Sequence, residues 1–129
     1  MRESYLENDY AEIWIEDGIV FNIYKPNLVL TLDVAKLLVE DRLKVSNGVS
    51  RPLFADISEL VSVDRNARRY LSREGGKLVD AGAFLVTSPI SKFAGNIFMK
   101  IDKPSVPMRL FTSKERAIDW LKSSSRGDR

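Results

Sequence analysis

Four short apolar segments of this chain are each followed by a segment with helical spacing, and this alternation limits the fold more than any other feature. The apolar segments span residues 10–25, 51–57, 82–86 and 108–111. Strands that alternate with helices form sheets whose inner strands are largely parallel and are joined by right-handed crossovers. The sequence therefore predicts an α/β domain with a mixed sheet, helices packed on the sheet and the order β-β-α-β-α-β-α-β-α.

The first apolar segment has the pattern of a hairpin. Asp17-Gly18 separates two runs in which successive side chains alternate between two faces. This dipeptide tolerates the positive φ angles of a two-residue turn. Pro26 cannot donate a hydrogen bond to a sheet, so we expect the second strand to end just before it.

Capping residues mark the ends of the first two helices. Thr31 precedes the first helix and Asn47 follows it, while Arg42 is counted on its inner face because the side chain has a long aliphatic stem. The second helix is expected to start near Asp64 and to end before Gly75-Gly76.

Length and composition suit one folded domain with one core. The chain has 129 residues, of which 44% are hydrophobic and 29% are charged. No internal repeat or linker divides it, so residues 1–129 are interpreted as a single domain. Its polar ends, residues 1–9 and 123–129, are expected to be flexible.

Two residue types that carry much of enzyme chemistry are missing. The sequence contains no cysteine and no histidine. Disulfides, thiolate or imidazole metal ligands, cysteine nucleophiles and serine–histidine triads are therefore excluded. Because no other catalytic motif is present, the sequence predicts a protein that is not an enzyme and has no cofactor.

Charge and hydropathy bear on partners and location. The formal net charge of +2 is too small for the concentrated field with which proteins bind nucleic acid, so no nucleic-acid partner is expected. The first ten residues lack the basic and apolar parts of a secretory signal. No apolar run nears the roughly 20 residues that span a bilayer. The sequence predicts a cytoplasmic protein with no transmembrane segment.

The element order and two motifs resemble a known family. Leu53-Phe54-Ala55-Asp56-Ile57-Ser58, followed by Ser62-Val63-Asp64-Arg65-Asn66-Ala67, resembles the STAS domain family, which includes bacterial anti-sigma-factor antagonists of the SpoIIAA type. Residues 11–18, 88–92, 110–112 and 120–121 look more narrowly like an uncharacterised bacterial group of SpoIIAA-like proteins. The resemblance covers almost the whole chain. It implies a STAS-like fold, and the narrower group has no established activity that could be carried over.

The resemblance also bears on regulation. In STAS antagonists, the loop after the second buried strand ends in Asp-Ser-Ser-Gly, and a partner kinase phosphorylates the second serine. Matching Asp64 to the aspartate places Arg65 and Asn66 at the serines and Ala67 at the glycine. The resemblance therefore implies a regulatory or protein-interaction module that lacks the usual phosphorylatable serine.

Two loops that follow inner strands carry polar residues, and open α/β sheets bind ligands at this edge. Ser58, Ser62, Asp64 and Asn66 form a candidate partner or ligand loop. Capping of the second helix by Ser62 or Asp64 is the simpler interpretation of part of this loop.

The second loop leads into the third helix. Thr87, Ser88 and Lys92 form a candidate anion site, because free helix amides and a lysine one turn into the helix attract negative charge. Ser88 also has the side chain of an N-cap and Pro89 suits the first helical position, so capping alone is the alternative interpretation.

The third helix carries more apolar residues than a stripe facing one sheet needs. These residues are Ile90, Phe93, Ala94, Ile97, Phe98, Met99 and Ile101. Trp14 and Tyr24 on the hairpin have amphipathic rings of the kind enriched at interfaces. We therefore expect a homodimer with Trp14, Tyr24, Phe98 and Met99 as the candidate interface. Packing of Phe98 and Met99 beneath the following loop is the alternative.

Two functions stay open on the sequence. The first is a non-catalytic regulatory or interaction module with an unidentified protein partner. The second is a small-molecule or lipid-binding domain that uses the third helix and the strand-end loops, as lipid-binding relatives of this fold suggest. An enzyme that relies on Asp, Lys, Ser or Tyr is permitted by composition, but no motif supports it.

Overall fold

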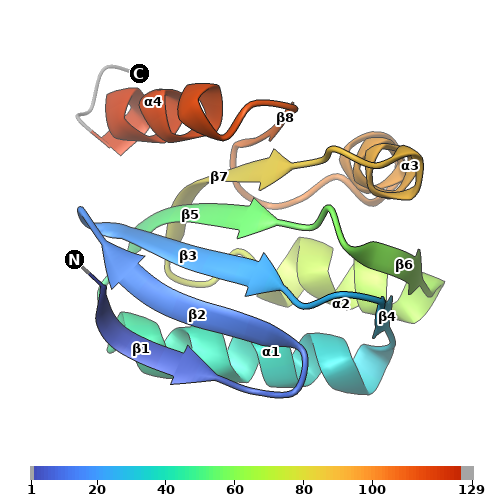
Figure 1. Ribbon diagram of the computed structural model, residues 1–129, viewed down its shortest axis with the longest axis horizontal. Helices are drawn as coiled ribbons and strands as arrows, with labels where there is room; N and C mark the ends of the chain where they lie inside the picture. Colours follow the sequence, from blue (N-terminus) through green and yellow to red (C-terminus); the bar gives the residue numbers. More distant parts are fainter. Residues whose placement is uncertain (1, 126–129) are drawn as a thin grey trace.

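A mixed sheet runs through the middle of the molecule (Figure 1). The computed structural model describes residues 2–125. In spatial order, the strands of the sheet are β1 (Glu3–Glu7), β2 (Ala11–Glu16), β3 (Ile19–Tyr24), β5 (Arg51–Asp56), β7 (Val79–Leu85) and β8 (Met108–Phe111). Two short strands, β4 (Leu28–Leu30) and β6 (Leu60–Val63), pair with each other. The helices are α1 (Leu32–Ser46), α2 (Arg65–Glu74), α3 (Pro89–Ile97), the π-helical turn η1 (Phe98–Asp102) and α4 (Lys114–Ser125).

The predicted hairpin is confirmed. Strands β2 and β3 are antiparallel, and Glu16 pairs with Ile19 across the turn. Asp17 and Gly18 have φ angles of 53° and 76°, the positive values that a two-residue hairpin turn needs.

The parallel half of the sheet is also confirmed. Strand β5 lies between β3 and β7, and β8 follows β7, all in parallel. Leu53 and Ala55 belong to the core cluster on one face of the sheet, whereas Phe54 belongs to the cluster on the other face. Strand β5 is therefore apolar on both sides, as expected for a strand covered on both faces.

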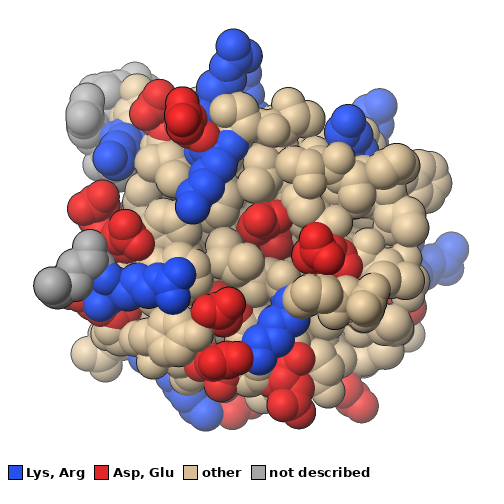
Figure 2. Space-filling view, in the orientation of Figure 1, with Lys and Arg blue, Asp and Glu red and all other residues tan. Residues whose placement is uncertain are grey.

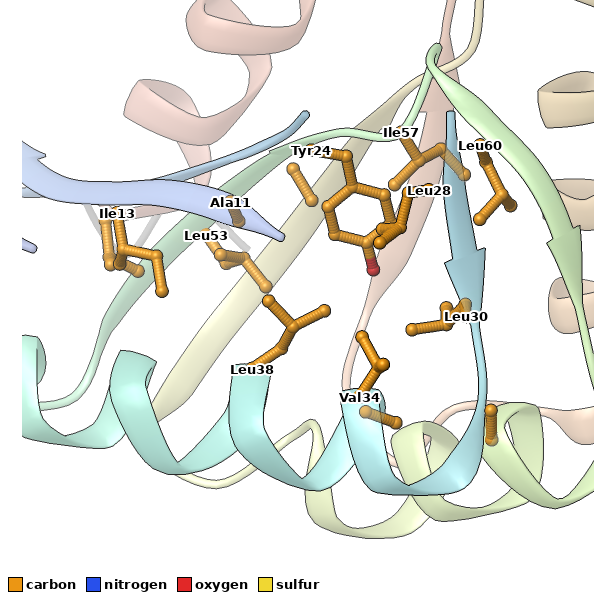
Figure 3. Packing of buried hydrophobic residues seen from close by; sticks show 14 of the residues in the cluster. Ala11, Ile13, Tyr24, Leu28, Leu30, Val34, Leu38, Leu53, Ile57 and Leu60 are labelled. Carbon is orange, nitrogen blue, oxygen red and sulfur yellow. The ribbon is translucent and has the colours of Figure 1, made fainter. Parts of the chain in front are cut away.

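Helices cover the two faces unequally (Figure 1). Helices α1 and α2 cover one face, and the larger core cluster lies beneath them (Figure 3). Helix α4 covers β5 and β7 on the opposite face, where Ala117 and Leu121 are fully buried against a cluster that contains Phe54. Helix α3 lies beyond the carboxyl ends of β5 and β7 (Figure 1).

The predicted helix ends agree with the observed caps. The hydroxyl of Thr31 accepts a hydrogen bond from the Val34 amide at the start of α1. Asn47 ends the helix in the left-handed conformation, with a φ of 51°, and its amide donates to the Leu43 carbonyl. Local capping chemistry therefore sets both ends of α1.

The amino-terminal segment differs from the prediction. Residues 1–9 were expected to be flexible, but Glu3–Glu7 form the edge strand β1 against β2. Leu6 packs against the core, and the Tyr5 ring stacks on Trp14 with centroids 6.3 Å apart. Most side chains of β1 are exposed, so the segment does not need the alternation of apolar and polar residues that marks a strand in the sequence. At the other end, α4 extends to Ser125, and residues 126–129 lie outside the described residues.

The short parallel pair β4–β6 was also not predicted. The sequence predicts a loop around Ser58 and Ser62, but Leu60–Val63 pair with Leu28–Leu30. Leu28, Leu30 and Leu60 all contribute to the larger core cluster. Short strands of this kind depend on partners far away in the chain, so local sequence carries little sign of them. No helix within residues 2–125 combines the length and the hydropathy needed to cross a membrane.

Candidate functional site

Two of the predicted loops meet at the carboxyl ends of β5 and β7. The Thr87 amide donates a hydrogen bond of 3.2 Å to the Ser58 hydroxyl, and the Ser88 hydroxyl donates one of 2.9 Å to the Ser58 carbonyl. The Ser58 amide in turn donates to a carboxylate oxygen of Asp56. The structure therefore brings Ser58 together with Thr87 and Ser88.

The start of α3 is a closed capping box. The Ser91 amide donates to the Ser88 hydroxyl at 3.1 Å, and the Ser88 amide donates to the Ser91 hydroxyl at 3.0 Å. The Thr87 amide is already bonded to Ser58, and Pro89 has no amide hydrogen. Most of the donors that an anion would need at this terminus are therefore engaged within the protein. This geometry supports the capping interpretation of Thr87 and Ser88 and leaves Lys92 as an exposed neighbour.

The rest of the first candidate loop lies apart from Ser58. Asp64 is the N-cap of α2, with the Ala67 amide 2.7 Å from a carboxylate oxygen. Ser62 is exposed on β6, and Asn66 is exposed in the first turn of α2. Within residues 2–125, no hydrogen bond joins Ser62, Asp64 or Asn66 to Ser58.

The predicted interface is wrong for three of its four residues. Trp14, Tyr24 and Phe98 are buried, and Met99 is half-buried. Trp14 stacks on Phe21 with centroids 5.3 Å apart and is covered by β1, which the sequence pattern did not reveal. Tyr24 and Phe98 point into the space between the sheet and the helices, so none of the three offers an exposed surface.

Other apolar residues of the third helix are exposed instead. Ile90, Phe93 and Ile101 have exposed fractions of 49%, 69% and 70%. The buried side of α3 is built from small residues, and a Cβ atom at Gly95 would lie only 3.1 Å from Leu110. In the sequence, the small residues Ser91, Ala94 and Gly95 indicate which side of α3 faces the sheet.

Three lysines belong to the same segment of the chain, residues 90–103. Lys92, Lys100 and Lys103 are exposed, and no carboxylate within residues 2–125 forms an ion pair with them. The side chain of Asp102 is buried and pairs with Arg68 at 2.8 Å, so its charge is neutralised. We call the six residues the α3 face: Ile90, Phe93, Ile101, Lys92, Lys100 and Lys103.

The α3 face is distinct from the acidic parts of the surface. In Figure 2 the region over α3 is mostly uncharged, and Asp and Glu gather elsewhere on this side of the molecule. Within the described residues, no three Asp or Glu side chains are grouped so that they could hold a metal ion.

A family model for a domain of unknown function, DUF7793, matches residues 13–125 of the chain. The chain belongs to the DUF7793 family. The match begins within β2 and covers the later strands and each of the helices described above, so the family corresponds to the fold without β1 and the first two residues of β2.

Two solved structures are similar to this DUF7793 domain. The first is an uncharacterized protein of the DUF3478 family with a SpoIIAA-like fold, from Shewanella loihica PV-4. It is 18% identical with a TM-score of 0.57, and the match covers 90% of this chain and 98% of that one. The second, a protein with unknown function from Arthrobacter sp. FB24, is 24% identical with a TM-score of 0.33, over 84% of this chain and 95% of that one. Among curated proteins, no sequence matches the chain.

The first of these structures confirms the predicted fold. The sequence resemblance implied a SpoIIAA-like fold in an uncharacterised family, and the DUF7793 domain has that fold. At this level of identity the similarity concerns the fold alone, so function has to be argued from the residues of this chain.

Proposed function

We propose that this DUF7793 domain is a non-catalytic interaction module that binds an acidic, amphipathic segment of a partner protein on the α3 face. The observation that carries the proposal is the exposure of Phe93, a large aromatic side chain that is 69% accessible on a well-capped helix. Exposed apolar residues that cluster on a folded domain mark interaction sites, whereas singly scattered ones do not.

The chemistry of the α3 face favours an acidic partner. Phe93 lies three residues after Ile90, so helical spacing places the two on one side of α3, and Lys100 follows in the η1 turn. An amphipathic helix with carboxylates beside its apolar stripe would cover Phe93 and neutralise the unpaired lysines. A second copy of the chain would bring like charges together across a two-fold axis, which charge complementarity disfavours.

The hydroxyl cluster beneath α3 supports a non-catalytic role. Ser58, Ser88 and Ser91 bond to one another and to backbone groups, and within residues 2–125 none of their hydroxyls bonds to a carboxylate or an amine that could activate it as a nucleophile. The position at which STAS antagonists carry the phosphorylated serine is occupied by Asn66, which has no hydroxyl.

Selection of peptides on the purified protein tests the proposal. A displayed library of random peptides of about 16 residues, which is about 24 Å of helix, would be selected against the wild-type domain. We expect acidic peptides with apolar residues at intervals of three or four. Their affinity should fall at least tenfold for Phe93→Glu and should decrease with salt. Val49→Glu is the matched control, because Val49 is also an exposed apolar residue but lies outside the α3 face.

Four outcomes would contradict this proposal. The first two concern the peptides: selection of neutral or basic peptides, and peptide binding that Phe93→Glu leaves unchanged. The third is a concentration-dependent dimer in light scattering that Phe93→Glu abolishes. The fourth is preferential binding of the protein to vesicles of anionic lipid. The last two would assign the α3 face to a second copy of the chain or to a membrane surface.

A further inference from the structure

A cavity of about 60 Å³ lies between α1, the middle of the sheet and the segment that follows η1. Its walls are mostly apolar and include Leu38, Leu53, Ala55, Phe84, Phe98 and Val106. Gly75, Gly76 and Ser105, which are half-buried or exposed, also line it. The cavity therefore opens toward solvent between the end of α2 and residues 104–106.

Polar side chains of β3 and α1 line the same cavity. Asn22 and Tyr24 are two residues apart on β3, so both side chains lie on the face that α1 covers. Arg42 lies one turn after Leu38 on the inner side of α1. Figure 3 shows the Tyr24 ring extending toward α1 between Leu28 and Leu38.

Two of these side chains are only partly hydrogen-bonded within residues 2–125. Arg42 is 2% exposed, and the one hydrogen bond of its guanidinium runs from Nη2 to the Gly75 carbonyl at 3.2 Å. Its Nη1 atom and the Oδ1 atom of Asn22, which is 7% exposed, have no hydrogen-bond partner within residues 2–125. No carboxylate of the described residues pairs with Arg42.

Burying a cation without a counter-ion costs free energy of folding, so the presence of Arg42 at this position needs an explanation. Burial lowers the pKa of Arg42 to about 10, with desolvation as the cause. This value is still well above neutral pH, so the guanidinium keeps its positive charge in the folded protein. A ligand that supplies one negative charge in this cavity would remove the cost.

We propose that the cavity binds a short-chain monocarboxylate, with the carboxylate on Arg42 and the alkyl group against the apolar wall. A planar carboxylate can form two parallel hydrogen bonds with a guanidinium, and the Tyr24 hydroxyl adds a further donor. At roughly 10–15 Å³ for each water-sized group, the cavity holds about four to six non-hydrogen atoms, which fits propionate. This site lies in the interior and does not depend on the α3 face.

Calorimetric titration and thermal unfolding of the wild-type protein with propionate test the proposal directly. We expect saturable binding and a Tm that rises with propionate concentration, because a ligand that binds only the folded state stabilises it. Propionamide, which has the same shape without the charge, should not raise Tm. Sulfate at matched ionic strength should not either, and octanoate should bind more weakly than propionate because it exceeds the cavity.

Variants then assign the binding to named residues. Arg42→Met should weaken propionate binding at least tenfold, since it removes a charge-assisted pair. Tyr24→Phe should weaken it about threefold to tenfold through loss of one hydrogen bond. Lys36→Met is the matched control, because Lys36 is an exposed residue of α1 and its loss changes the net charge equally without touching the cavity.

The comparison of propionate with propionamide keeps the test decisive even if Arg42→Met fails to fold. Equal stabilisation by propionamide or by sulfate would overturn the proposal, as would unchanged propionate binding in a folded Arg42→Met variant. No binding of any monocarboxylate at about 10 mM, roughly tenfold above a Kd of 1 mM, would indicate a cavity that holds only water. Peptide selection on the α3 face would be unaffected by any of these results.

Discussion

Tyr24 is a residue whose ionisation is governed by its place in the core. Alternation along β3 turns Val20, Asn22 and Tyr24 toward α1, and the Tyr24 side chain is buried there. Burial raises the pKa of Tyr24, because desolvation penalises the phenolate form. In the unfolded chain the hydroxyl titrates near its usual pKa of about 10. The contribution of Tyr24 to stability is therefore complete below pH 10 and is lost as the pH rises above it.

We expect Tyr24→Phe to gain stability relative to the wild type as the pH rises. Between pH 8 and pH 10.5 the relative gain should be about 0.8 kcal/mol, the free energy of ionising one unfolded tyrosine at that pH. Urea midpoints of both proteins, measured in about 1 M salt, give this difference. The lowered pKa of Arg42 has the opposite effect on stability as the pH rises. Arg42 is present in both proteins, so its contribution cancels in the difference between their free energies of unfolding.

Tyr5→Phe is the control for this measurement. The pKa of Tyr5 is raised to about 12, first by its hydrogen bond to the Glu12 carboxylate, but Tyr5 is exposed and salt screens such interactions. In high salt, the Tyr5→Phe protein should follow the wild type more closely than Tyr24→Phe does. A Tyr24→Phe protein that keeps a constant difference from the wild type across this range would contradict the assignment.

At the scale of elements, Asp64 connects the β4–β6 pair to helix α2. Its backbone amide donates to the Leu30 carbonyl and continues the contact between β4 and β6, while its side chain caps α2. Helix α2 buries few of its residues, with Ala67 and Ser72 as its buried positions. A short helix with a narrow buried face depends more than others on its cap.

We expect Asp64→Ala to lower the free energy of unfolding by about 1 kcal/mol, within a range of about 0.5–2 kcal/mol. Asp64→Asn should cost much less, because asparagine offers an equivalent acceptor oxygen and the backbone bond to Leu30 is unchanged. Urea unfolding followed by circular dichroism measures both values. Equal losses in the two variants would show that the charge of Asp64, rather than its capping hydrogen bond, stabilises α2.

At the scale of the whole molecule, the described residues form two core clusters on opposite sides of one sheet. The larger lies under α1 and α2, and the smaller lies under α4. Strand β5 contributes Leu53 to the first and Phe54 to the second. Because one backbone holds both clusters in place, loss of either should weaken the other, and the chain should unfold in one cooperative step.

Leu121 offers a test of this coupling, since it is fully buried on α4. We expect Leu121→Ala to cost about 2–5 kcal/mol and to shift every probe of unfolding together. Trp14 reports on the sheet and Trp120 on α4, so Trp120→Phe and Trp14→Phe backgrounds separate the two fluorescence signals. A Trp120 transition at lower urea than that of Trp14 would mean that α4 detaches as an independent unit.

Local residue chemistry was sufficient for much of the fold. Asp17-Gly18, Thr31 and Ser88 predicted the hairpin and two helix starts, because turns and caps depend on backbone angles and hydrogen bonds within a few residues. The alternation of strands and helices predicted the parallel half of the sheet for a similar reason, since short crossovers leave few topologies.

The sites depended on tertiary packing. The sequence of the third helix shows a single apolar stripe. Only the close packing of Gly95 against Leu110 shows that Gly95 faces inward and Phe93 outward. Arg42 was placed on the inner face of its helix through its aliphatic stem, yet the guanidinium is buried as well, because Asn22 and the end of α2 enclose it. Burial and unpaired polarity arise from segments far apart in the chain, and the spacing of residues within one segment carries no information about them.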